Sequence, residues 1–180
     1  MEAKRRGAES VLWLDCSVWA VRDISPVWDK IERDGFWLVN NGWHIGQWAS
    51  DYCLDLFGLT RDRAMTMLDL SAMAIGLSMR DPRAVAWLDE FYEHCHNPRL
   101  MNGSLHNVPG KEITDPHSGV NYGIISADPR CLGHSREQVV AGILAYKHGL
   151  LPYTNPPELL HCLQPDRQPD SRAVLQACGL

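Results

Sequence analysis

Short apolar runs separated by turn-forming residues are the first pattern along this chain. Residues 11–17 (Val-Leu-Trp-Leu-Asp-Cys-Ser) form an apolar run that ends on a carboxylate and a hydroxyl. A run of this length predicts a fully buried strand, of the kind found inside a parallel sheet that is covered on both faces. Two further apolar runs, at residues 36–39 and 71–79, predict strands, and residues 40–42 (Asn-Asn-Gly) predict a turn.

Between these runs the apolar positions follow the period of an α-helix. One helix face is defined by apolar residues at positions i, i+3, i+4 and i+7, namely Ile24, Val27, Trp28 and Ile31. Ser25 suits the N-cap of this helix, Pro26 its first turn and Gly35 its end. Similar patterns predict helices at residues 48–57, 60–68, 81–95 and 135–149, and the last turn of a helix at residues 2–7.

Two stretches lack this periodicity. Residues 97–133 are rich in Gly, Pro, Asn and His and predict a long loop, which in a compact domain is usually functional or mobile. Residues 152–180 are rich in proline and predict an extended tail. Strands and helices therefore predict a single α/β domain over residues 1–151, followed by the tail at residues 152–180.

Composition and charge narrow the class of protein. The chain is 45% hydrophobic and 22% charged, as in soluble globular proteins, and its formal net charge of -5 argues against non-specific nucleic-acid binding. No apolar run is long enough to span a membrane and no signal-peptide pattern precedes the first strand, so we expect a cytoplasmic protein. The six cysteines have no repeated short spacing, which argues for reduced thiols and against a disulfide framework or a CxxC zinc site.

Asp15 is the first candidate site residue. It follows the first predicted strand, and the carboxyl ends of parallel strands are where open α/β sheets bind ligands. A buried carboxylate is costly unless it is paired, hydrogen-bonded or bound to a metal ion, so Asp15 needs a partner. That partner is either a metal ion or diphosphate, or the backbone of a turn that Asp15 caps.

Four motifs in the order of the chain resemble nucleotide-sugar glycosyltransferases of the GT-A fold. They are residues 12–19 (Leu-Trp-Leu-Asp-Cys-Ser-Val-Trp), 35–36 (Gly-Phe), 46–51 (Gly-Gln-Trp-Ala-Ser-Asp) and 133–138 (Gly-His-Ser-Arg-Glu-Gln). The resemblance covers about residues 11–150 and implies a partial GT-A-like, Rossmann-like mixed sheet flanked by helices. In that family the strands that hold base and ribose come well before the aspartate motif. The resemblance therefore implies that the N-terminal nucleotide-binding part is missing.

The resemblance also implies a divalent metal ion. In such enzymes an Asp-x-Asp signature at a strand end binds the cation that holds the sugar-nucleotide diphosphate, and oxygen ligands suit Mn²⁺ or Mg²⁺. Asp15 matches the first aspartate, whereas Ser17 replaces the second and removes one negative charge. Ser17 can still bind metal or substrate through its hydroxyl.

The late motif and the helix at residues 48–57 supply the other candidates. The resemblance implies that His134 contacts metal or phosphate, and that Glu137 and Gln138 contact the sugar or the acceptor, with Glu137 as a candidate catalytic residue. The alternative is that Ser135 and Gln138 form a capping box at the start of a helix.

Asp51 resembles a residue of the sugar pocket, where a carboxylate can accept hydroxyl hydrogen bonds or act as a base. A solvated aspartate on a helix face is the alternative. Trp48, together with Trp43, has a ring that can stack on a sugar, although large aromatic residues more often belong to a core. His94 and His96 point to nearly opposite sides of a helix, which argues against a zinc site.

Two functions of different classes follow. The first is a hexosyltransferase-like enzyme that transfers a sugar from a nucleotide-diphosphate donor to an unknown acceptor with the help of Mn²⁺ or Mg²⁺. The second is a non-catalytic, truncated fragment or pseudoenzyme that acts as an interaction module, with self-association through an exposed sheet edge.

Overall fold

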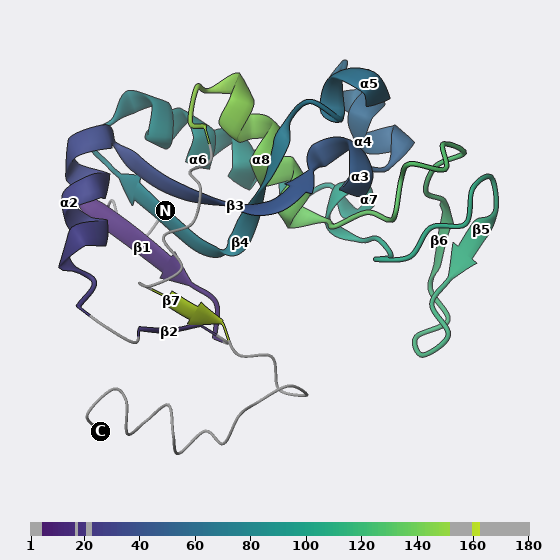
Figure 1. The fold of residues 1–180 in the computed structure, drawn as a ribbon, viewed down its shortest axis with the longest axis horizontal. Helices are drawn as coiled ribbons and strands as arrows, with labels where there is room; N and C mark the ends of the chain where they lie inside the picture. Colours follow the sequence, from purple (N-terminus) through teal and green to yellow (C-terminus); the bar gives the residue numbers. More distant parts are fainter. Residues whose placement is uncertain (1–4, 17, 21–22, 152–159, 163–180) are drawn as a thin grey trace.

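The computed structural model describes residues 5–16, 18–20, 23–151 and 160–162 of the 180-residue chain. This part is a mixed α/β structure in which a three-stranded antiparallel sheet lies between helices (Figure 1). The strands are β1 (Ser10–Leu14), β2 (Val18–Ala20), β3 (Phe36–His44), β4 (Leu68–Ser78), β5 (Glu112–Thr114), β6 (Asn121–Ile124) and β7 (Leu160–Cys162). The helices are α2 (Ser25–Asp34), α3 (Ile45–Trp48), α4 (Asp51–Leu56), α5 (Arg61–Ala64), α6 (Pro82–His94), α7 (Pro98–Met101) and α8 (Glu137–Lys147).

The main sheet is antiparallel, which corrects the prediction of a parallel sheet. Its order is β1-β4-β3, and β4 pairs antiparallel with both neighbours, with Leu12 opposite Gly76 and Leu38 opposite Ile75. β1 pairs with β4 on one side and with no other described strand, so it is an edge strand rather than a fully buried one. This sheet establishes neither a Rossmann nor a GT-A arrangement, and the rule for the carboxyl ends of parallel strands does not apply to Asp15.

Alternate residues of the sheet belong to two different cores. Trp37 and Val39 pack with α2, whereas Phe36 and Leu38 pack in the larger core beneath α6 and α8. This alternation follows from the two-residue period of a strand. Helix α2 therefore covers one face of the sheet while α6 and α8 cover the other (Figure 1).

Helix predictions are right where a cap and an apolar stripe coincide. The predicted helix at residues 81–95 is α6, and the Asp81 side chain accepts a hydrogen bond from the backbone N–H of Arg83. Helix α2 ends at Gly35 with φ of 86°, a left-handed conformation that glycine adopts most readily. The predicted N-cap of α2 is wrong, because Ile24 occupies that position and the Ser25 hydroxyl donates to Asp23.

The segment at residues 45–68 departs more from the prediction. Of the helix predicted at residues 48–57, only residues 51–56 form a helix, α4, because the Ser50 side chain accepts a hydrogen bond from Cys53 N–H and begins it there. Trp48 instead ends the separate helix α3. The helix predicted at residues 60–68 is only the short α5, capped by Thr60 as expected, since β4 begins at Leu68. Capping chemistry thus predicts the start of α5 correctly, but not its length.

Strand β3 runs through the predicted turn. Its register against β4 shifts between Leu38 and Asn40 and again between Asn40 and His44. Asn40 accepts a side-chain hydrogen bond from Gly42 N–H, and Asn41 accepts one from Trp43 N–H. The turn-forming residues therefore produce irregularities inside a long strand instead of ending it.

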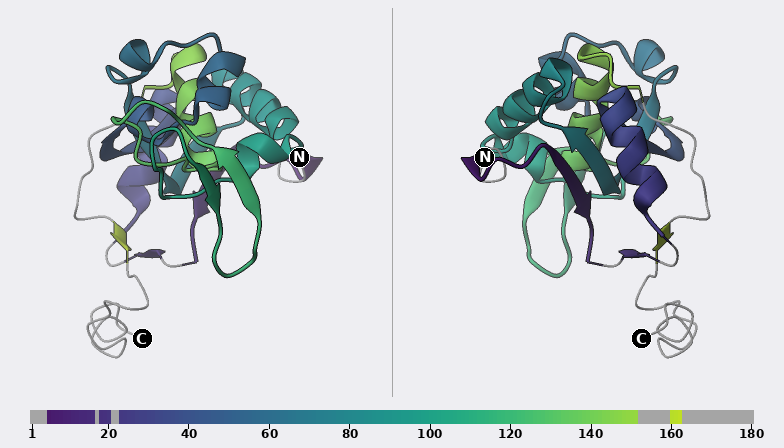
Figure 2. Two further views of the ribbon diagram at one scale, coloured as in Figure 1. Left: turned by 90° about the vertical axis from the view of Figure 1, so that its right-hand side faces the viewer. Right: turned by 90° about the vertical axis from the view of Figure 1, so that its left-hand side faces the viewer.

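The predicted loop at residues 97–133 contains structure of its own. Helix α7 starts it, and β5 and β6 then form an antiparallel hairpin. Figure 2 shows this hairpin extending away from the helices and the sheet. In the predicted proline-rich tail, β7 pairs with β2, and the other residues of 152–180 lie outside the described part.

Four of the cysteines divide into two groups by burial. Cys53 and Cys131 are buried, whereas Cys16 and Cys95 are exposed, and all four are free thiols. Burial raises the pKa of Cys53 to about 12, despite the opposing effect of the Arg61 charge. Among the described residues, no helix combines the length and the apolar character that crossing a bilayer requires.

Candidate functional site

Two cavities adjoin at the start of α8. The first, here called the apolar cleft, has a volume of about 550 Å³ and is lined by Val11, Trp13, Asp15, Ala72, Met73, Ile75, Leu77, Trp87, Leu88, Phe91, Glu137, Gln138 and Ala141. The second, here called the polar cavity, has a volume of about 450 Å³ and is lined by Asn41, Trp43, Trp48, Ser71, Met73, Leu105, Ser135, Arg136, Glu137 and Gln138. Met73, Glu137 and Gln138 line both cavities, so they form the boundary between them.

Asp15 lies in the apolar cleft beside Met73, one of the boundary residues. Its backbone N–H donates to the carbonyl of Met73 at 2.9 Å, and its own carbonyl accepts from Val18 N–H in the turn that leaves β1. Asp15 is half-buried and lines the apolar cleft together with Glu137 and Gln138. The first and the last of the four sequence motifs therefore contribute residues to one cavity.

The start of α8 is strained and is not capped by a side chain. Arg136 occupies the N-cap position with φ of 56° and ψ of -124°, a conformation that costs a residue other than glycine about 1–3 kcal/mol. Ser135 Oγ is buried without a hydrogen-bond partner among the described residues. The Ser135–Gln138 capping box is thus not formed, and the Gln138 side chain is directed elsewhere.

Gln138 donates to a buried carboxylate that the sequence did not single out. Asp69 is fully buried in β4 and accepts hydrogen bonds from Gln138 Nε2 at 2.8 Å, from Asn41 Nδ2 at 3.0 Å and from Leu70 N–H. Burial raises the pKa of Asp69, while these donors oppose that shift. A Cβ at Gly142 would lie 3.0 Å from Asp69 Oδ1, so glycine lets α8 approach the carboxylate.

A signal for Asp69 was present in the sequence. The residue lies between Leu68 and Leu70 within an apolar stretch, where a carboxylate needs a specific partner. The predicted helix ended at residue 68 and the predicted strand began at residue 71, which left Asp69 between the two elements. The amide partners Asn41 and Gln138 come from β3 and α8 and could not be inferred from spacing.

Two tryptophans form an aromatic wall of the polar cavity. The rings of Trp43 and Trp48 meet edge to face with their centroids 5.7 Å apart. Trp43 is 44% exposed and Trp48 is half-buried, so neither is a residue of the main core. Both rings line this cavity.

His134 lies elsewhere and has a structural role. It is buried, its Nδ1 accepts from Ser50 N–H at 3.2 Å, and its Nε2 lies 2.9 Å from the carbonyl of Leu100. Burial lowers the pKa of His134, which favours the neutral ring with the proton on Nε2. Both nitrogens are therefore engaged by the backbone, and this geometry does not support the predicted contact of His134 with a metal ion.

Asp51 also organises the backbone instead of lining either cavity. Its carboxylate accepts from Arg61, from Ser126 Oγ at 2.7 Å and from Ala127 N–H at 3.3 Å. The buried Arg61 side chain in turn donates to two backbone carbonyls of the preceding segment at 2.6 Å each. This network connects the start of α4 to the segment after β6, and it occupies the carboxylate that was predicted to act as a base.

No group of three or more His, Cys, Asp or Glu side chains within the described ranges is arranged to hold a metal ion. Ser17, the second candidate ligand of the aspartate motif, lies outside the described residues. A cation at Asp15 would therefore need most of its ligands from a bound substrate and from water.

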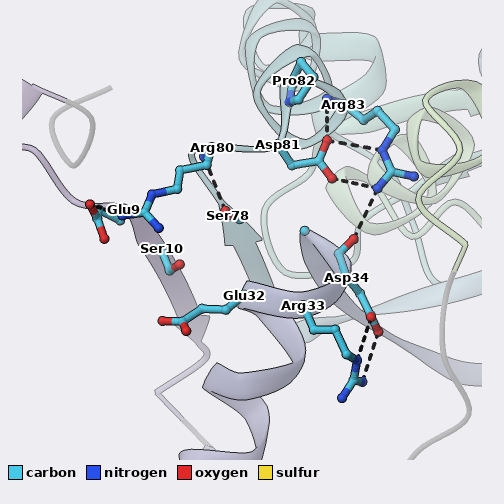
Figure 3. A pocket seen from close by; sticks show the side chains of 11 residues that line it. Glu9, Ser10, Glu32, Arg33, Asp34, Ser78, Arg80, Asp81, Pro82 and Arg83 are labelled. Carbon is cyan, nitrogen blue, oxygen red and sulfur yellow. Dashed lines mark hydrogen bonds and ion pairs between the residues drawn. The ribbon is translucent and has the colours of Figure 1, made fainter.

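A third cavity, of about 470 Å³, is lined by charged residues that pair with one another (Figure 3). Arg83 donates to the Asp81 carboxylate at 2.7 Å and to the backbone carbonyl of Asp34, and Arg80 forms an ion pair with Glu9. These contacts join α2, α6 and the start of β1. The cavity is consequently a structural junction and a poor candidate for a ligand site.

Comparison of the chain with protein-family models, curated proteins and solved structures finds no significant match. The geometry defines a candidate ligand site of two parts, one apolar and one polar with an aromatic wall. The Glu137 carboxylate lies at their boundary and Asp15 lies in the apolar part.

Proposed function

We propose that this chain is a glycosyltransferase-like protein that transfers a sugar from a nucleotide-diphosphate donor to an acceptor with the assistance of Mn²⁺ or Mg²⁺. The observation that carries the proposal is that Asp15 and the pair Glu137 and Gln138, which come from opposite ends of the resemblance, line one cavity. The adjoining polar cavity offers aromatic rings and amide and hydroxyl groups, which suit a sugar.

The polar cavity provides groups for sugar binding. Trp48 and Trp43 can stack against the C–H face of a sugar ring. Gln138 is held by its hydrogen bond to Asp69, which leaves its amide oxygen for a ligand. A rigidly held amide contributes more to orientation than a mobile one, because less side-chain entropy is lost on binding.

The carboxylates of the apolar cleft suit the two remaining tasks. Asp15 can ligate a cation whose other ligands are phosphate oxygens and water, the arrangement that Mg²⁺ usually adopts with nucleotides. When bound, the cation would neutralise negative charge on the departing nucleoside diphosphate. Glu137 is exposed at the first turn of α8 and can accept the proton of the acceptor hydroxyl. In this transfer the bond from the sugar to the diphosphate breaks and a bond to the acceptor oxygen forms.

Thermal unfolding tests the proposal. The described lining of the apolar cleft contains two carboxylates and no basic residue, so a diphosphate should bind only together with a cation. We expect stabilisation by Mn²⁺ with a nucleoside diphosphate, of about 2.7 kcal/mol at a hundredfold excess over Kd, and by neither alone. Asp15→Asn should abolish this effect, while Asp55→Asn, a control at an exposed position of α4, should retain it. Equal stabilisation of the Asp15→Asn variant would contradict the assignment.

One observation favours a second function, that of an interaction module. β1 is an edge strand, and Trp13 on it is 59% exposed. An exposed edge strand can pair with another chain, so we propose self-association along β1 as this alternative. It predicts that the sedimentation coefficient rises with concentration and that Trp13→Glu prevents the rise. A constant monomer over a wide concentration range would rule it out.

A further inference from the structure

The apolar cleft is larger and more aromatic than a site for a cation at Asp15 alone would require. Its volume of about 550 Å³ lies within the range of roughly 300–1,000 Å³ that is typical of small-molecule sites. It lies between strands β1 and β4 on one side and helices α6 and α8 on the other. Trp13 and Met73 are exposed in its lining, whereas Leu77 and Trp87 are buried.

One wall of the cleft is formed by two aromatic rings of α6. The rings of Trp87 and Phe91 in α6 are stacked with an interplanar angle of 7° and centroids 5.2 Å apart. Trp87 is buried, and its indole N–H donates to the carbonyl of Ala141 in α8 at 3.0 Å, which fixes the ring between the two helices. A planar or alkyl group can therefore pack in the cleft at little cost in side-chain ordering.

The polar end of the cleft has a definite charge. Asp15, Glu137 and Gln138 are its described polar lining residues, and the lining includes no described Lys, Arg or His. The amino terminus of α8 contributes a partial positive charge equivalent to about half an elementary charge, which the two carboxylates exceed. The polar end therefore favours a group that donates hydrogen bonds or carries positive charge, and it disfavours an anion.

We propose that the apolar cleft binds an amphipathic small molecule, with its aromatic or alkyl body between Trp13 and the Trp87–Phe91 wall. Its hydroxyl or amine end meets Asp15 and Glu137. If the glycosyl transfer proposed above is correct, on which this role rests, the molecule is the acceptor, and its hydroxyl reaches the boundary with the polar cavity. The cleft thus assigns the substrate class as an apolar alcohol or amine rather than a phosphorylated or acidic compound.

Binding of three probes that share one ring tests the inference without nucleotide or metal. The probes are naphthylethylamine, naphthylethanol and naphthylacetate, measured by titration calorimetry with the full chain. We expect the amine to bind at least about tenfold more tightly than the acetate, with the alcohol between them. Failure of all three to bind, or equal binding of the amine and the acetate, would overturn the inference.

Two variants locate the binding. Ala72→Phe fills the cleft from a half-buried position of β4 and should weaken the amine by about tenfold or more, whereas Ala127→Phe, at an exposed position away from the cleft, should leave it unchanged. The double variant Asp15→Asn/Glu137→Gln should remove the preference for the amine over the acetate, while Glu93→Gln in α6 should retain it. An unchanged amine affinity in Ala72→Phe would overturn the inference.

These measurements separate the two proposals. Probe binding with no response to nucleoside diphosphate and Mn²⁺ would retain the apolar site and remove the glycosyl transfer. A nucleotide response without probe binding would do the reverse.

Discussion

Asp69 is the residue whose environment is least like that of an ordinary side chain of its type. It is fully buried, and two side-chain amides and one backbone N–H donate to it. Burial raises its pKa, so folding favours the protonated form. At neutral pH the ionised carboxylate then reduces the stability of the fold, and the donors from Asn41 and Gln138 offset only part of that cost.

This linkage predicts a pH dependence of stability. Because the pKa of Asp69 is higher in the folded state than in the unfolded state, the stability it contributes is complete below the unfolded pKa and is lost as the pH rises through the folded pKa. The wild type should therefore gain stability relative to Asp69→Asn as the pH is lowered through the folded pKa towards the unfolded pKa. Urea unfolding of both proteins across that range measures the difference. A gain in the opposite direction would show that the amide donors dominate over burial.

At the residue scale the structure brings some of the candidate residues together and places others apart from them. Asp15, Glu137 and Gln138 meet at one cavity, but His134 and Asp51 bind the backbone instead. The order of motifs can identify such residues as candidates, because it depends only on their positions along the sequence. It cannot show that a histidine is buried with both nitrogens engaged, since that depends on backbone groups distant in sequence.

At the scale of elements, local chemistry predicted α2 and α6 well, and the sheet less well. A helix can be recognised in a sequence from the period of its apolar residues, its capping residue and its final glycine, and each of these signals is local. The orientation and position of β1 depend on which strand pairs with it, and an apolar run looks the same in a buried parallel strand as in an antiparallel edge strand. The strained conformation of Arg136 at the start of α8 likewise leaves no pattern in the local sequence, so it could not be predicted.

The packing of α2 on the sheet depends on a glycine. A Cβ at Gly76 in β4 would lie 2.5 Å from Ile31 Cδ1 and 3.2 Å from Trp37 Cβ. We expect Gly76→Ala to destabilise the protein by about 1–3 kcal/mol, the usual cost of overpacking a core. Chemical denaturation measures this change.

A double-mutant cycle separates overpacking from a change in strand propensity. Ile31→Val removes Cδ1, so it should cost less in the Gly76→Ala background than in the wild type, where it leaves a small cavity. Strictly additive effects would mean that the contact with Ile31 is not the cause.

At the scale of the whole molecule, Arg61 links parts that are far apart in the chain. Its guanidinium donates to the carbonyls of Gly46 and Ala49, to Asp51 and to Ser126 Oγ. These groups belong to α3, to the segment that precedes α4, to α4 itself and to the segment that follows β6. The fold around the polar cavity and the base of the β5–β6 hairpin are therefore held by a single buried cation.

Removal of that cation should be strongly destabilising. We expect Arg61→Met to cost about 3–5 kcal/mol, because it leaves buried acceptors without a donor and Asp51 without its partner. Arg63→Met, at an exposed position of the same helix, is the matched control and should cost less than about 1 kcal/mol. Thermal unfolding of both variants measures the difference. Similar small losses in the two variants would show that the network around Arg61 contributes little.

Alkylation of a buried thiol can measure how readily the interior of the protein opens. A thiol reacts with an alkylating reagent as the thiolate, and at neutral pH Cys53, with its pKa raised to about 12, has almost none. Cys16 and Cys95 should consequently be modified first, and Cys53 only when the helical core opens. The rate at which Cys53 is alkylated in native buffer, compared with that of an unfolded peptide, then gives the free energy of this opening directly. A ligand that fills the cavities at the start of α8 would slow the alkylation of Cys53. Its binding could then be detected without an assay of its chemistry.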